Sequence, residues 1–130
     1  MIPRQTLFPA LAAAFAIAPL AAAYAFEFEP YQASVVQKAI QSGESVVVHV
    51  YAPWCLQCQA QKSILAGLAG DKSLDRIKFF RVSYDDQKDI VAALNVPRST
   101  LIAYKGGREV ARMSWGTSQA DVVKVLQAAY

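Results

Sequence analysis

Hydrophobic and polar positions along the chain predict helices and strands in alternation. Apolar residues recur at helical spacing in four segments, which cover residues 31–42, 55–68, 87–94 and 118–130. Runs rich in β-branched and aromatic residues predict strands at residues 46–51, 78–83, 100–104 and 109–113. The run at 46–51 is nearly all apolar, which indicates a central strand that is covered on both faces.

Turn and capping residues support these boundaries. Gly43 follows the first helix and suits a left-handed turn, and Ser118 can cap the last helix. Gly106-Gly107 between the last two strands predicts a two-residue hairpin. Strands separated by helices pair in parallel, whereas a hairpin adds antiparallel strands. The pattern therefore predicts an α/β fold with a central mixed β-sheet flanked by helices.

Residues 1–25 do not fit this pattern. Arg4 is followed by an uncharged stretch of Ala, Leu, Phe and Ile that ends in Ala23-Tyr24-Ala25, with small residues at the two positions that a signal peptidase reads. We interpret residues 1–25 as a cleaved secretory signal peptide and residues 26–130 as the mature domain.

An uncleaved membrane anchor is the alternative for the same segment, because its apolar stretch approaches the ~20 residues that span a bilayer. Pro9 and Pro19 and the alanine-rich composition argue against a stable spanning helix.

Composition and charge limit the number of domains and the kinds of binding partner. The 130 residues, 55% of them hydrophobic, suffice for one compact core and not for two. The net charge of +3 is spread thinly, and no run of Lys or Arg is interleaved with aromatics. We therefore expect a single domain that does not bind nucleic acid.

Candidate chemistry lies at Trp54-Cys55-Leu56-Gln57-Cys58, where the first predicted strand turns into a helix. A thiol at a helix N-terminus ionises more easily, because the unpaired amides and the macrodipole favour an anion. Cys55 is thus the expected attacking thiolate. Two intervening residues bring Cys58 within reach of a disulfide with Cys55, so we expect Cys58 to be the more buried, resolving thiol.

The cysteine pair has two alternative uses. A structural zinc site needs four ligands, whereas the chain offers these two cysteines and one histidine, so no metal is expected. A purely structural disulfide is the second alternative, but a bridge that closes so short a loop restrains the unfolded chain little.

The segment from Val46 to Cys58 resembles the active-site strand and loop of the thioredoxin family, and Tyr104-Lys105-Gly106-Gly107 resembles its hairpin. The resemblance covers most of residues 26–130, and the segment from Tyr51 to Cys58 is closest to that of periplasmic thioredoxin-like proteins of Gram-negative bacteria. It implies a thioredoxin fold and disulfide exchange through Cys55 and Cys58, with no cofactor beyond their own redox-active disulfide. Trp54 is then expected beside the cysteines, where it shields the site and contacts substrate, and ordinary core packing is the alternative for this residue.

Three positions depart from the family's pattern. His49 stands where thioredoxins have a buried carboxylate that accepts the proton of the second cysteine, and either a general base or an ordinary core histidine fits it. Ser99 stands where a cis-proline contacts substrate, so either Pro97 takes that role or the proline is lost, with Arg98 read as a surface charge. Leu56-Gln57, which tunes the Cys55 thiolate, is uncharged.

These residues lead us to expect an exported protein thiol-disulfide oxidoreductase, with reduction as the favoured direction. It would be a monomer that exchanges disulfides with protein substrates and depends on an external electron donor or acceptor, such as a membrane redox protein. The alternative is a thioredoxin-fold binding module or chaperone in which the cysteines form a non-catalytic bridge.

Overall fold

The computed structural model describes residues 28–130. The expected signal peptide at residues 1–25 lies outside the described residues, and the boundary at residue 26 stays a prediction.

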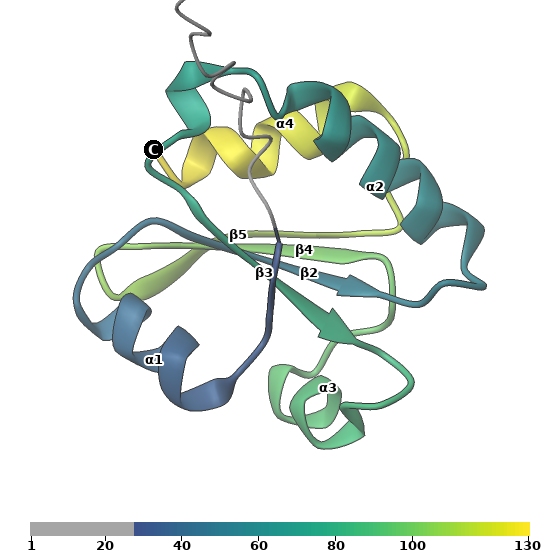
Figure 1. Cartoon of the computed structure of the whole chain (residues 1–130), viewed down its shortest axis with the longest axis horizontal. Coiled ribbons are helices and arrows are strands. Elements are labelled where there is room, and N and C mark those ends of the chain that lie inside the picture. The colour runs from purple at the N-terminus through teal and green to yellow at the C-terminus, as the bar shows by residue number, and fades with distance from the viewer. Residues whose placement is uncertain (1–27) are drawn as a thin grey trace, which may run out of the picture.

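In the described part of the chain, five strands form one mixed sheet in the order β1-β3-β2-β4-β5 (Figure 1). β1 pairs with β3 and β3 with β2 in parallel, whereas β4 runs antiparallel to both β2 and β5. The predicted mixed sheet is therefore confirmed. The strands are β1 (Glu29–Pro30), β2 (Val46–Tyr51), β3 (Lys78–Ser83), β4 (Thr100–Lys105) and β5 (Arg108–Ser114).

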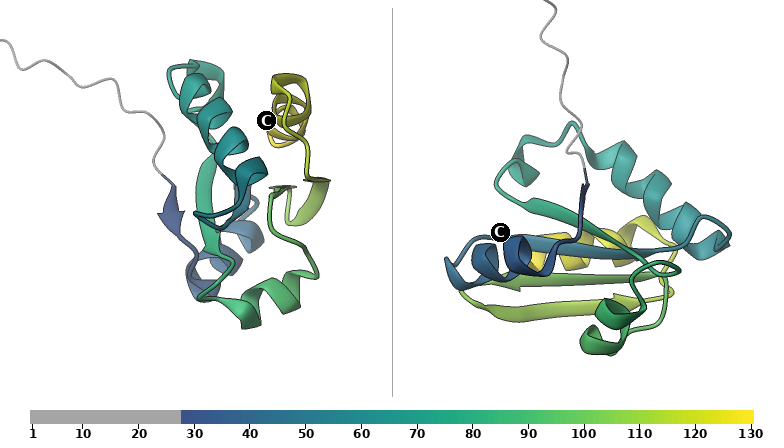
Figure 2. Two further views of the ribbon diagram at one scale, coloured as in Figure 1. Left: turned by 90° about the vertical axis from the view of Figure 1, so that its right-hand side faces the viewer. Right: turned by 60° about the horizontal axis from the view of Figure 1, so that its bottom comes forward.

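Helices cover both faces of this sheet, as the views in Figures 1 and 2 show. α2 (Leu56–Leu68) and α4 (Gln119–Ala128) lie over one face, and α1 (Ala33–Gln41) and α3 (Lys88–Leu94) lie over the other. A short 3-10 helix, η1 (Lys72–Leu74), connects α2 to β3. None of the described helices is long and apolar enough to cross a membrane.

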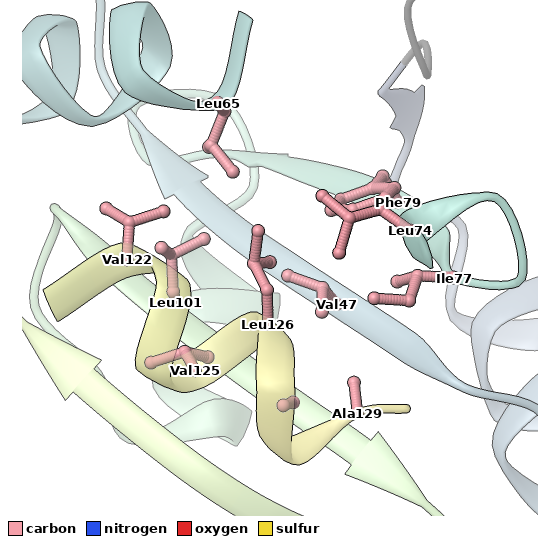
Figure 3. Packing of buried hydrophobic residues seen from close by; sticks show 11 residues of the cluster. Val47, Leu65, Leu74, Ile77, Phe79, Leu101, Val122, Val125, Leu126 and Ala129 are labelled. Carbon is pink, nitrogen blue, oxygen red and sulfur yellow. The ribbon is translucent and has the colours of Figure 1, made fainter. Parts of the chain in front are cut away.

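Two hydrophobic clusters flank β2, which is buried from both sides as its sequence predicts. On one face, α4 packs Val122, Val125 and Leu126 against Val47 and Leu101 of the sheet (Figure 3). On the other face, residues of α1 and α3 pack against the alternate residues of β2. Burial of a side chain of this size contributes about 1.5–3 kcal/mol, so the two clusters hold β2 rigidly. The active-site loop follows directly from its end.

The predicted turn and cap residues act as expected. Gly106 and Gly107 have φ of +62° and +83°, the left-handed values that a two-residue hairpin turn requires. The Ser118 side chain accepts a hydrogen bond from the backbone N–H of Asp121 and so caps α4.

The sequence pattern missed the edge strand β1 and the short helix η1. It also began the first helix at residue 31, whereas α1 begins at Ala33. The reason is that the Tyr31 backbone N–H donates to the Arg81 carbonyl at 2.9 Å, which extends the pairing of β1 with β3. A two-residue strand is too short for periodicity to reveal.

Candidate active site

Cys55 is the N-cap residue of α2, at the point where the chain leaves β2. Its Sγ accepts the backbone N–H of Cys58 at 3.2 Å, which satisfies one of the unpaired donors at the start of the helix. The expected position of Cys55 at a helix N-terminus is therefore what the structure shows.

Cys58 lies in the first turn of α2 and faces the sheet. Its Sγ is 3.9 Å from the Val50 carbonyl oxygen of β2. Both cysteines are free thiols, and their exposed fractions are 0% for Cys58 and 2% for Cys55. Cys58 is thus the more buried thiol, but by a small margin.

Ser99 lies against both sulfurs. Its Oγ is 3.0 Å from Cys55 Sγ and 3.0 Å from Cys58 Sγ, and the residue is fully buried. Its backbone has a φ of +59°, a left-handed value that the ring of proline excludes. The loop has therefore taken a geometry that no proline at this position could adopt.

The pKa values of the two thiols are shifted in opposite directions. Burial raises the pKa of Cys55, but hydrogen bonds from Cys58, Ser99 and Arg98 outweigh it, so that the net pKa is lowered. Burial and the neighbouring Cys55 raise the pKa of Cys58. Cys55 is therefore the thiol that ionises first.

His49 is fully buried in β2, and the structure surrounds it with partners other than Cys58. Its Nε2 lies 3.0 Å from Gln61 Oε1, and its Nδ1 lies 3.4 Å from an Nη of Arg81. Burial first, and then the charge of Arg81, lower the pKa of His49 to about 3. This geometry supports the core-histidine alternative and corrects the expectation of a general base, because Nε2–H donates to Gln61 while Nδ1 accepts from Arg81.

Gln61 is the site residue that sequence reasoning missed. It is fully buried in α2, where its Nε2 donates to the carbonyl oxygens of Ser99 at 3.0 Å and Gly116 at 2.8 Å. Its Oε1 receives the Nε2–H of His49. A signal was present, since Gln61 follows Cys58 by three positions and precedes Leu65 by four, the spacing of one helix face.

Arg98 does not behave as the ordinary surface charge that was expected. Its guanidinium carbon lies 4.7 Å from the ring centroid of Trp54 and 4.9 Å from that of Trp115. Both indoles are half-exposed, so the three side chains form a cation–π stack beside the cysteines.

The stack is tied to the loop after β3. Trp54 Nε1–H donates to both carboxylate oxygens of Asp85, at 2.9 and 3.1 Å. The indole also meets Tyr84 edge-on, with ring centroids 6.3 Å apart. Trp54 thereby links Arg98 to Asp85 at the edge of the site.

Pro97 lies beside α3. It is exposed and lines a cavity of about 400 Å³ with residues of α3, and its carbonyl accepts the hydroxyl of Thr100. Of the two residues considered for the proline role, Ser99 is the one that contacts the cysteines.

The dipeptide between the cysteines is open to solvent. Leu56 is 82% exposed, and Gln57 Oε1 lies 3.8 Å from Cys55 Sγ. Within residues 28–130, no three His, Cys, Asp or Glu side chains gather in a way that could hold a metal ion.

Residues 27–128 match the family model described as Thioredoxin. The chain belongs to the thioredoxin family. Thioredoxins are protein disulfide oxidoreductases that need no cofactor, because the redox-active disulfide belongs to the protein itself, and this member carries both cysteines. The predicted fold and enzyme class are thereby confirmed at the level of the family.

Similarity to individual thioredoxins is moderate. The chain is 33% identical over 78 residues to a thioredoxin H-type of Fagopyrum esculentum, covering 59% of this chain and 66% of that protein, just under two thirds of its length. It is 34% identical over 83 residues to thioredoxin-2 of Saccharomyces cerevisiae, covering 62% of this chain and 78% of that protein.

A solved structure of Trxlp from Edwardsiella tarda is 35% identical, with a TM-score of 0.72 over 77% of this chain and 98% of that one. A thioredoxin of Malassezia sympodialis, at 15% identity and a TM-score of 0.69, covers 79% of this chain and 90% of that one and shows the fold alone.

Proposed function

We propose that this thioredoxin is an exported enzyme that reduces disulfides of protein substrates, with Cys55 as the attacking thiol and Cys58 as the resolving thiol. The observation that carries this assignment is the position of Cys55 as N-cap of α2, with its sulfur accepting the Cys58 backbone N–H. The lowered pKa of Cys55 and the raised pKa of Cys58 support the same order of attack.

The exchange proceeds in two steps. The Cys55 thiolate attacks one sulfur of a substrate disulfide, a Cys55–substrate disulfide forms, and the other substrate sulfur leaves as a thiolate. Cys58 then attacks Cys55 Sγ, the mixed disulfide breaks, and the second substrate sulfur leaves. Two electrons pass from the cysteine pair to the substrate, the Cys58 proton goes to one substrate sulfur, the other substrate thiolate takes a proton from solvent, and a Cys55–Cys58 disulfide remains.

Renewed activity requires an external donor of two electrons. For an exported protein without a cofactor, a membrane redox protein is the partner we propose, because the periplasm holds no soluble buffer that reduces thiols. The half-exposed Trp54 and the exposed Leu56 supply apolar contact around Cys55 for an extended substrate chain. Export rests on the composition of residues 1–25.

Trapping the first intermediate tests the proposal. The full chain carrying Cys58→Ala, produced in a Gram-negative bacterium, is expected to accumulate covalent adducts with periplasmic proteins that dithiothreitol releases. The matched control is the double variant Cys55→Ala/Cys58→Ala, which should form none. The exported chain should begin at Phe26 by mass, and the intact protein should catalyse insulin reduction by dithiothreitol.

Absence of both adducts and insulin reduction would favour the binding module with a non-catalytic bridge. If the chain keeps residues 1–25 and is found in the membrane fraction, the uncleaved anchor is favoured. That result would not contradict the proposed disulfide exchange.

A further inference from the structure

The hydroxyl of Ser99 is placed so that it can serve both sulfurs of the active site. Its Oγ lies 3.0 Å from each Sγ, inside a site where Ser99 itself is fully buried. A hydroxyl carries a single hydrogen and two lone pairs, so it can donate to only one sulfur at a time while it accepts from the other.

Three separate elements hold this hydroxyl in place. The Ser99 backbone N–H donates to the Val50 carbonyl of β2 at 3.0 Å. The Ser99 carbonyl accepts the Trp115 backbone N–H at 2.8 Å and the Gln61 side-chain amide of α2 at 3.0 Å. With both backbone groups bonded, the remaining freedom of Ser99 is rotation about its Cα–Cβ and Cβ–Oγ bonds, and full burial of the residue restricts the first of these.

We propose that Ser99 is a catalytic residue whose hydroxyl donates to the Cys55 thiolate in the reduced protein and turns to the forming Cys58 thiolate in the mixed disulfide. This inference rests on the proposed disulfide exchange and adds the group that stabilises the charge in each of its two steps.

The proton balance follows from the two steps. In the reduced protein the hydroxyl donates to Cys55 and accepts the S–H of Cys58, which lowers the pKa of the first thiol and leaves the second protonated. Once Cys55 is bonded to the substrate it carries no charge, and the hydrogen of Ser99 is free for Cys58. Cys58 gives its proton to the substrate thiolate released in the first step, and Ser99 keeps its own proton throughout.

Among the described residues, Ser99 has the one hydroxyl that contacts both sulfurs, whereas Arg98 hydrogen-bonds Cys55 alone. Gln57 Oε1 can only accept from Cys55 and lies at 3.8 Å, and both ring nitrogens of His49 are engaged elsewhere. The charged or titratable groups that bear on the sulfurs are the two thiols themselves and Arg98 of the same loop. Asp85 is linked to the site through its hydrogen bond with Trp54, and His49 is linked to it through its hydrogen bond with Gln61.

Ellman's reagent separates the two steps in one experiment. The reduced protein releases one coloured thiolate when Cys55 attacks and a second when Cys58 resolves the mixed disulfide, so stopped-flow mixing gives both rates across a range of pH. Ser99→Ala and Ser99→Gly each remove the hydroxyl. Glycine also suits the φ of +59°, so at least one of the two variants keeps the loop conformation.

Loss of a hydrogen bond to a charged group corresponds to roughly a tenfold change or more in equilibrium. We therefore expect both hydroxyl-free variants to release the second thiolate about tenfold more slowly. The first release should also be about tenfold slower below the pKa of Cys55, with the midpoint of its pH profile moved upward. Thr100→Val is the control, because its hydroxyl contacts Pro97 and Ser114 and neither sulfur.

Rates and pH profiles within twofold of wild type in both Ser99 variants would overturn the proposal. A wild-type protein that releases no second thiolate and does not catalyse insulin reduction would instead overturn the proposed function, so the two failures are distinguishable.

Discussion

His49 occupies a position where the family pattern has a carboxylate, and its partners in this chain make it a neutral residue. Arg81 donates toward one ring nitrogen and Gln61 accepts from the other. The Arg81 guanidinium also lies over the rings of Phe28 and Tyr51, 4.1 and 5.1 Å from their centroids. Burial first, and then the Arg81 cation, disfavour a protonated imidazole here, and together they lower the pKa of His49 to about 3.

This depressed pKa predicts that the folded protein loses stability as the pH falls below the ordinary histidine pKa of about 6.5. The unfolded chain binds a proton at His49 that the folded chain does not accept until about pH 3, so stability is complete above about pH 6.5 and declines below it. Between pH 7 and pH 5 the free energy of unfolding should fall by about 2 kcal/mol from this group.

Urea unfolding of the reduced protein at the two pH values measures the loss. His49 is the single histidine of the chain, so a His49→Gln variant, whose amide can still donate to Gln61, should lack this part of the decline. Equal declines in the two proteins would show that His49 is protonated alike in the folded and unfolded chains.

At the scale of elements, α2 organises the site through one face. Cys58, Gln61 and Leu65 recur at intervals of three and four, and all are buried against the sheet. Cys55 precedes them at the N-cap. One helix thereby presents the attacking thiol at its end, the resolving thiol in its first turn, and the amide that holds the Ser99 loop in its second.

Two glycine substitutions test how these elements are built. In α2, a Cβ at Gly67 would meet no atom within 4 Å, so Gly67→Ala should stabilise the fold by roughly 0.5–1 kcal/mol through helix propensity.

In the β4–β5 turn, Gly107 has a φ of +83°, so Gly107→Ala should destabilise the fold by about 1–2 kcal/mol.

Urea unfolding of wild type and of the two variants measures both changes in the free energy of unfolding, an increase for Gly67→Ala and a decrease for Gly107→Ala. Stabilisation by Gly107→Ala would mean that the hairpin does not use the left-handed turn described here.

At the scale of the whole molecule, the direction of electron flow depends on how strongly the protein stabilises its dithiol form relative to its disulfide form. Hydrogen bonds and the start of α2 stabilise the thiolate of Cys55, which favours the reduced form and raises the potential, but Leu56 and Gln57 add no charge that would raise it further toward that of an oxidant. We expect a reduction potential near or below about −250 mV, in the range of a reductant.

Equilibration with glutathione buffers measures this potential. Ser99→Gly is a useful companion variant: loss of a hydrogen bond to the thiolate destabilises the reduced form, so its potential should lie below that of wild type. A wild-type value near about −120 mV would assign the protein to the oxidants.

The local sequence pattern alone determined several elements of the fold and the position of the attacking cysteine. The bounds of β2 and β3, the Gly106-Gly107 turn and the Ser118 cap all depend on residues close together in the chain, and the structure agrees with each. The same holds for the position of Cys55 at a helix start, because a buried strand is followed within a few residues by a helical pattern that begins next to Cys55.

Tertiary structure decided the surroundings of the two sulfurs. Ser99 is 44 positions from Cys55 in the chain and reaches it because β4 pairs with β2. Gln61 joins His49 to Ser99, and Arg98 joins Trp54 to Trp115, across gaps of between 12 and 44 positions. Hydrophobic periodicity records which face of an element is buried but not which polar atoms meet there. For that reason the sequence identified the cysteines, and only the fold identified the hydroxyl between them.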